Sequence, residues 1–170
     1  MLKTVAALSL ALILCSQSAF PQEAGTPAKE DDLYSVALFT SIAAMENSWG
    51  HIDDSNGGST IRTDYRHMFV VKNPEITEGL PQQLRDYRVE YLDDESLIDR
   101  YEKLRKQFSV LEILPIHNNG GKLAIHVAMN YVTYKKRHLN FGISNWADIE
   151  FSYDCENQRY IISAVKLGGV

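Results

Sequence analysis

The sequence has little cysteine and no basic run longer than three residues. Its 170 residues include two cysteines, Cys15 and Cys155, and Cys15 lies in a segment that we expect to be removed, so no intrachain disulfide is expected in the mature chain. Seventeen basic residues stand against 22 acidic ones, which gives a formal net charge of -5. Because nucleic-acid binding requires a basic surface that neutralises phosphates, no nucleic acid is expected as a partner.

The N-terminal apolar run is too short to cross a bilayer. It extends from Val5 to Cys15, about half of the ~20 residues that a membrane-spanning helix needs. With Lys3 before it, this run predicts a signal peptide over residues 1–20 and therefore a secreted or periplasmic location. Bulky Leu14 directly before Cys15 argues against a lipoprotein anchor at that cysteine. The mature chain is expected to have no transmembrane span.

Proline and glycine are also scarce, with 5 and 10 residues, whereas 45% of the chain is hydrophobic. This composition is typical of a globular domain with a core of its own. Residues 21–30, which contain Pro21 and Pro27, predict a flexible leader. Residues 31–170 are then expected to form a single α+β domain.

Two amphipathic helices are indicated by their spacing and caps. Asp31 or Asp32 can cap a first helix that runs to about Trp49, before Gly50 ends it. Its apolar face is expected to contain Leu33, Val36, Ala37, Thr40 and Ala44. Further apolar residues widen this face, so the helix is expected to be buried on more than one side; they are Tyr34, Leu38, Ile42 and Met45. Asp93 or Asp94 can cap a second helix, whose core-facing residues are Leu97, Tyr101, Leu104 and Phe108.

The second half of the chain predicts antiparallel strands. A strand over 109–117 leads into the turn at 118–121, and alternate residues from Leu123 to Thr133 are then apolar or aromatic. The odd positions from Leu139 to Tyr153 keep one parity, which predicts a single long strand, bent at Gly142. Residues 159–167 form the last strand. Earlier in the chain, residues 87–92 indicate a short strand, and residues 63–71 a strand or a short helix.

This order of elements resembles the nuclear transport factor 2-like (SnoaL-like, cystatin-like) superfamily. The resemblance is carried by residues 140–165, where Ile149–Asp154, a polar turn and Tyr160–Val165 look like a closing hairpin. It implies a cone-shaped α+β fold in which N-terminal helices pack on a curved antiparallel sheet of about four to five strands. It also implies a pocket between the concave sheet face and the helices, but no particular reaction.

No metal or cofactor signature stands out. The five histidines are never within four residues of one another, and no nucleophile elbow, phosphate loop or dinucleotide fingerprint is present. The acidic segment that begins at Asp53 matches a calcium loop poorly, because Asp64 stands where a bidentate Glu is expected, and a solvated loop is the alternative. We therefore predict neither a cofactor nor a metal site.

Candidate catalytic residues are Asp64, Tyr65 and His67, which supply acid, base and hydrogen-bond donor groups beside an apolar run. The alternative is that Tyr65 and His67 fill amphipathic positions and that Asp64 caps a turn. The expected ligand-binding residues of the pocket are Trp49, His51, Tyr101 and Phe141.

Alternation places His126, Asn130 and Tyr134 on one strand face, with Trp146 on the neighbouring strand. This mixture of aromatic and neutral polar groups favours a homodimer interface through the sheet face, and a solvated outer face is the alternative. Our hypothesis is an exported, non-catalytic domain that binds a small ligand or a protein. A cofactor-free lyase or isomerase and a cell-envelope accessory factor remain open alternatives.

Overall fold

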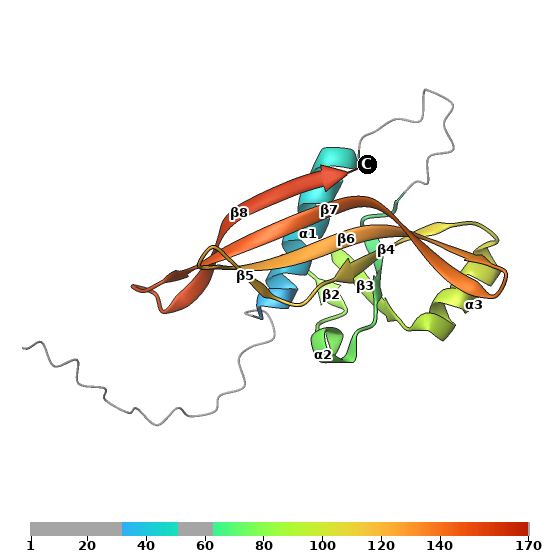
Figure 1. Cartoon of the computed structure of the whole chain (residues 1–170), viewed down its shortest axis with the longest axis horizontal. Helices are drawn as coiled ribbons and strands as arrows, with labels where there is room; N and C mark the ends of the chain where they lie inside the picture. The colour runs from blue at the N-terminus through green and yellow to red at the C-terminus, as the bar shows by residue number, and fades with distance from the viewer. Residues whose placement is uncertain (1–31, 51–62, 170) are drawn as a thin grey trace, which may run out of the picture.

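The computed structural model describes residues 32–50 and 63–169 (Figure 1). The predicted signal peptide, leader and Asp53 loop lie outside these residues. The elements are α1 (Leu33–Trp49), β1 (His67–Val71), α2 (Pro74–Thr77), β2 (Gln83–Leu84), β3 (Tyr87–Leu92), α3 (Asp94–Leu104), β4 (Phe108–Ile113), β5 (His117–Asn119), β6 (Lys122–Lys135), β7 (His138–Asp154) and β8 (Arg159–Gly169).

The strands form one large mixed sheet. Its order is β2-β3-β1-β4-β6-β7-β8, and β5 pairs with β6 to complete eight strands. β1 runs parallel to both β3 and β4, whereas the other pairs are antiparallel. The predicted cone, with helices on an antiparallel sheet of four to five strands, is therefore wrong.

The parallel part of the sheet exists because β1 has two apolar faces. Met68 and Val70 are buried in a first core cluster together with α1, whereas Phe69 and Val71 pack against a second cluster that contains Leu97 of α3. A strand covered on both faces belongs in the interior of a sheet. The sequence pattern at 63–71 does not show which strands pair with β1, so the parallel pairing was not predicted.

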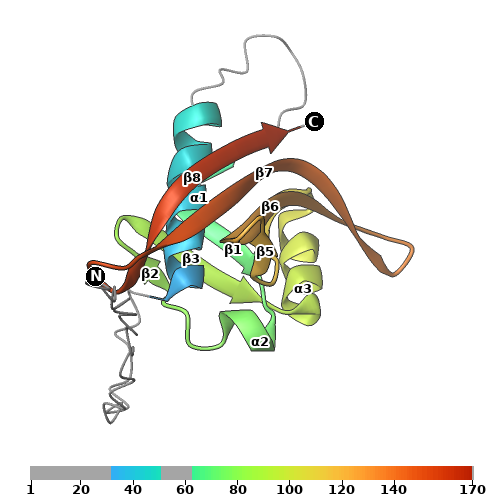
Figure 2. The same ribbon diagram turned by 60° about the vertical axis from the view of Figure 1, so that its left-hand side comes forward.

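The first helix was predicted with the correct ends. The Asp32 side chain accepts a hydrogen bond from the Tyr34 backbone N–H at 3.1 Å, and Gly50 follows the last helical residue. The widened face is the buried one: Leu38, Ile42 and Met45 are fully buried together with Ala37. The other residues of the narrower predicted face are only partly buried. In Figures 1 and 2, α1 crosses beneath the long strands β6, β7 and β8.

The second long helix, α3, lies on the opposite face of the sheet. It is the crossover between β3 and β4, which flank β1, and such a crossover must cover one face. The Asp93 side chain caps it by accepting from the Ser96 N–H at 2.9 Å, and Leu97 is fully buried. Phe108 belongs to β4 and not to this helix. The two long helices therefore do not enclose a common cavity.

The long C-terminal strands were predicted, but one change of face was missed. Met129 pairs with Asn145 and the next residue, Asn130, pairs with Ile143, so Ser144 is an extra residue in β7. The bulge exchanges the two faces of the strand. Ala147, Ile149 and Phe151 belong to the first cluster, whereas Leu139 packs against the second, although all four share odd parity.

Candidate functional site

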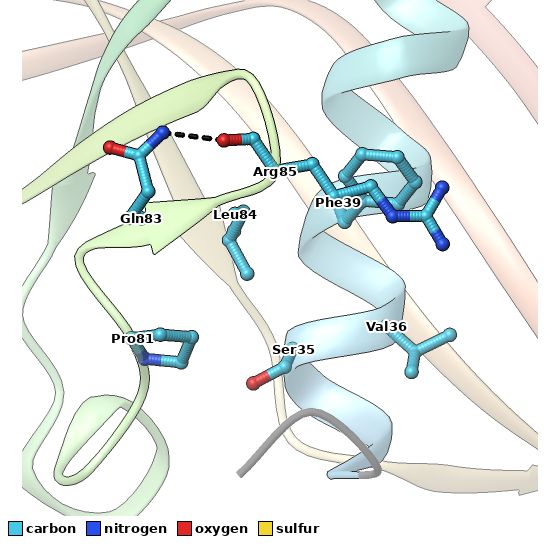
Figure 3. Close-up of a pocket in the computed structure, with 7 residues that line it drawn as sticks. All are labelled: Ser35, Val36, Phe39, Pro81, Gln83, Leu84 and Arg85. Carbon is cyan, nitrogen blue, oxygen red and sulfur yellow. Dashed lines mark hydrogen bonds between the residues drawn. The ribbon is translucent and has the colours of Figure 1, made fainter.

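A pocket lies between the first turns of α1 and the chain around β2 (Figure 3). Its volume is about 200 Å³. A cavity of roughly 150 Å³ is enough to hold one benzene ring, so this pocket has the size of a single ring with a short polar substituent. It is lined by Ser35, Val36, Phe39, Pro81, Gln83, Leu84 and Arg85.

The deepest polar group in the lining is the Ser35 hydroxyl. Ser35 is 3% exposed, and its Oγ has no hydrogen-bond partner within the described part of the chain. In Figure 3 this oxygen points from α1 toward the side of the pocket that contains Pro81. A buried polar atom without a partner costs about 1–3 kcal/mol, so a ligand that hydrogen-bonds to Ser35 would recover free energy.

The cation of the pocket is Arg85, in the two-residue turn between β2 and β3. Its φ is 53°, a left-handed conformation that costs a non-glycine residue roughly 1–2 kcal/mol. The Gln83 side-chain amide donates to the Arg85 carbonyl at 2.6 Å, and the Arg85 guanidinium lies 4.4 Å from the centre of the Phe39 ring. Arg85 takes part in none of the ion pairs formed by the described residues.

The wall of the pocket at Pro81 is tied to the sheet by Tyr91. The Tyr91 hydroxyl donates to the Pro81 carbonyl at 2.9 Å. Burial, with a smaller contribution from Asp32, raises the pKa of Tyr91 to about 12, so the phenol keeps the proton that this hydrogen bond needs. The positive end of the α1 dipole lies near Ser35 and favours negative charge there. The site therefore combines an apolar wall, one buried hydroxyl and one cation.

The structure separates the three residues predicted to be catalytic. The Asp64 carboxylate accepts from the Arg66 backbone N–H at 3.1 Å, which is a turn cap. Tyr65 is buried in the first cluster, where burial, followed by Tyr131 and Glu46, raises the pKa of its phenol to about 12. His67 lies on the same sheet face as Phe69, and its Nε2 is 3.5 Å from a carboxylate oxygen of Glu90. These side chains do not converge on one substrate position.

The predicted ligand-binding residues also lie on different sides of the sheet. Trp49 packs at the end of α1 against the first cluster. Tyr101 packs against the second cluster on the opposite face, where it meets the Tyr134 ring at 6.4 Å. Phe141 is 43% exposed and pairs with Val132 of that second cluster. His51 lies outside the described residues.

The predicted interface residues form two separate groups on the sheet face opposite α1. His126 is stacked on Trp146, and its Nδ1 lies 2.6 Å from Asp148 Oδ1. Asn130 is only 2% exposed and donates to Glu112 at 3.0 Å, while Tyr134 lies beside α3. The four residues therefore do not make one continuous surface, and their predicted role in a dimer is untested.

The described residues contain neither a metal-binding cluster nor a helix able to span a membrane. Within residues 32–50 and 63–169, no three metal-binding side chains gather into a group. In the same residues, no helix has the length and apolar character needed to cross a membrane. No protein-family model, curated protein or solved structure matches the chain.

Sequence reasoning missed the pocket because its lining comes from two segments more than forty positions apart. Ser35 and Phe39 belong to α1, whereas Pro81 to Arg85 belong to the connection between α2 and β3. One signal was present: Ser35 and Ser41 interrupt the buried stripe of α1, and small polar residues in a buried helix face need a partner. Nothing in the sequence indicated which segment approaches Ser35.

Proposed function

We propose that this protein is an exported, non-catalytic domain that binds a small carboxylate with an apolar body in the pocket between α1 and β2. One observation carries the proposal: the buried Ser35 hydroxyl, without a partner among the described residues, shares an apolar pocket with Arg85. Ligand pockets are typically apolar with a few polar groups that fix orientation, and this lining has that character.

The chemistry of the lining selects the ligand class. Leu84 and Val36 supply an apolar wall for one ring or one branched chain. The Arg85 guanidinium favours a carboxylate, because charge-assisted hydrogen bonds are about twice as strong as neutral ones. Ser35 Oγ can donate to a second ligand oxygen or accept from a ligand hydroxyl. Phenylacetate has both the ring and the carboxylate and serves as the probe.

The proposal is tested by calorimetric titration of the purified chain with phenylacetate. We expect a dissociation constant below about 1 mM, which corresponds to roughly -4 kcal/mol. Phenylacetamide, which has the same ring without the charge, should bind about tenfold more weakly, and acetate should show no measurable binding. Equal affinity for phenylacetate and phenylacetamide would exclude a role for Arg85.

Matched variants locate the site. Ser35→Ala should weaken binding about two- to tenfold and Arg85→Gln at least about tenfold, from the usual strengths of neutral and charged hydrogen bonds. Ser41→Ala is the control for Ser35, because Ser41 is fully buried on the same helix, also lacks a partner among the described residues and does not line the pocket. Arg137→Gln is the control for Arg85, because Arg137 has a φ of 66° in a different turn. Binding that is absent, or that all four variants weaken equally, would refute the proposal.

A further inference from the structure

The two edges of the sheet differ greatly in length. One edge is β2, with 2 residues, and the other is β8, with 11. β8 pairs only with β7, and Figure 2 shows no strand of the described chain on its far side. An edge strand presents backbone N–H and C=O groups with which a further strand can pair. β2 is too short to offer such a row, whereas β8 is not.

The sheet face that carries the first core cluster extends onto β8, where Leu167 packs against the cluster. Val165, Ile162 and Tyr160 pair with Ile149, Phe151 and Tyr153 of β7, so they lie on the face that α1 covers elsewhere. Ile149 and Phe151 are 0% and 1% exposed, whereas Val165 and Ile162 are both 40% exposed and Tyr160 is 44% exposed. Figure 1 shows the β7–β8 hairpin projecting beyond α1. The apolar row is thus left uncovered within the described part of the chain.

The charges of β8 are compensated within the sheet. Its only charged residues are Arg159 and Lys166. Lys166 Nζ is bound to the Glu150 carboxylate, and this hydrogen bond raises the pKa of Lys166 and lowers that of Glu150. Arg159 lies opposite Asp154. Although the chain is acidic overall, two copies can therefore approach along β8 without strong charge repulsion.

We propose that β8 pairs in antiparallel fashion with β8 of a second copy of this chain, about a two-fold axis perpendicular to the sheet. That rotation keeps the α1 faces of both copies on the same side, so the two rows of Tyr160, Ile162 and Val165 join into one apolar strip. A two-fold interface requires a surface that is complementary to itself, and a neutral edge with one apolar row meets that requirement. The second copy supplies both the missing strand and the missing apolar cover.

Sedimentation velocity of the purified chain, from micromolar to several hundred micromolar, tests this pairing. The wild-type chain should form a dimer in that range. Ile162→Lys should raise the dissociation constant on the order of 100-fold, because a substitution worth about tenfold occurs twice in a two-fold interface. Amide hydrogen exchange adds a second measurement, since β8 amides should exchange more slowly as the protein concentration rises.

Ile143→Lys is the matched control. Ile143 is 62% exposed, more than Ile162, but it lies in the part of β7 that does not pair with β8. It should leave the dimer intact. If Ile162→Lys does not fold, as judged by circular dichroism, Tyr160→Lys replaces it, because it removes a residue of the same row. A wild-type chain that stays monomeric throughout the range, or a dimer that Ile143→Lys weakens equally, would overturn the proposal.

Discussion

Replacement of Gly168 by alanine should displace the Trp146 indole from the outer face of the sheet. A Cβ atom at Gly168 would stand 2.2 Å from Trp146 Cζ2 and 2.3 Å from Cε2. Carbon atoms in contact are normally about 3.5–4.0 Å apart, so the ring must move by more than about 1 Å. Overpacking of this kind costs about 1–3 kcal/mol. Loss of the stacked contact with His126 adds about 0.5–1.5 kcal/mol.

The expected destabilisation of Gly168→Ala is therefore about 2–4 kcal/mol, or roughly 8–16 °C in Tm for a domain of this size. Thermal unfolding followed by circular dichroism measures it. Gly142→Ala is the control, because a Cβ there would meet nothing within 4 Å. It should leave Tm unchanged or raise it slightly. Equal Tm values for the two variants would show that the Gly168–Trp146 contact does not constrain the sheet.

Three further predictions concern the cores and the ion pairs. Tyr65→Phe tests the buried phenol, whose pKa is raised to about 12. As the pH rises from 10 through 12, the free energy of unfolding of the wild-type protein should fall by about 2–3 kcal/mol, whereas that of the variant should not show this fall. Urea titrations at each pH measure the difference. Glu150→Gln tests the carboxylate whose pKa the Lys166 hydrogen bond lowers: the variant should be less stable at pH 7, and the difference should disappear as the pH falls below 4.5. A difference independent of pH would contradict this role. Leu97 is fully buried in α3, and Leu97→Ala should lower the free energy of unfolding by about 2–5 kcal/mol. Leu104 on the same helix is 39% exposed, and Leu104→Ala should change that free energy by less than about 0.5 kcal/mol, as measured by urea unfolding.

The elements with strong periodicity or clear caps were predictable from the sequence. Asp32 and Gly50 bound α1, and alternation identified the long strands β6, β7 and β8. Strand pairing in the N-terminal half was not predictable, because a five-residue apolar strand such as β1 indicates neither its partners nor their direction. The superfamily resemblance depended on element order, and an antiparallel meander does not reveal that parallel strands extend it.

The position of side chains was harder to predict than the elements themselves. Residues near each other in sequence, such as Tyr65 and His67, belong to opposite faces of the sheet. Residues of the pocket, such as Ser35 and Arg85, are brought together only by the packing of α1 on the β2–β3 turn. The single long strand β7 was predicted correctly, but its constant parity was not, because one extra residue places the odd positions up to Ile143 on the face opposite the later ones.

That extra residue, Ser144, makes β7 a member of both hydrophobic layers of the molecule. Its hydroxyl donates to the Met129 carbonyl at 3.0 Å, which anchors the irregularity to β6. Deleting Ser144 would restore unbroken alternation and would direct Leu139 away from α3 or Ile149 away from α1. Because one continuous strand belongs to both layers, we expect the two layers to unfold together in a single cooperative step.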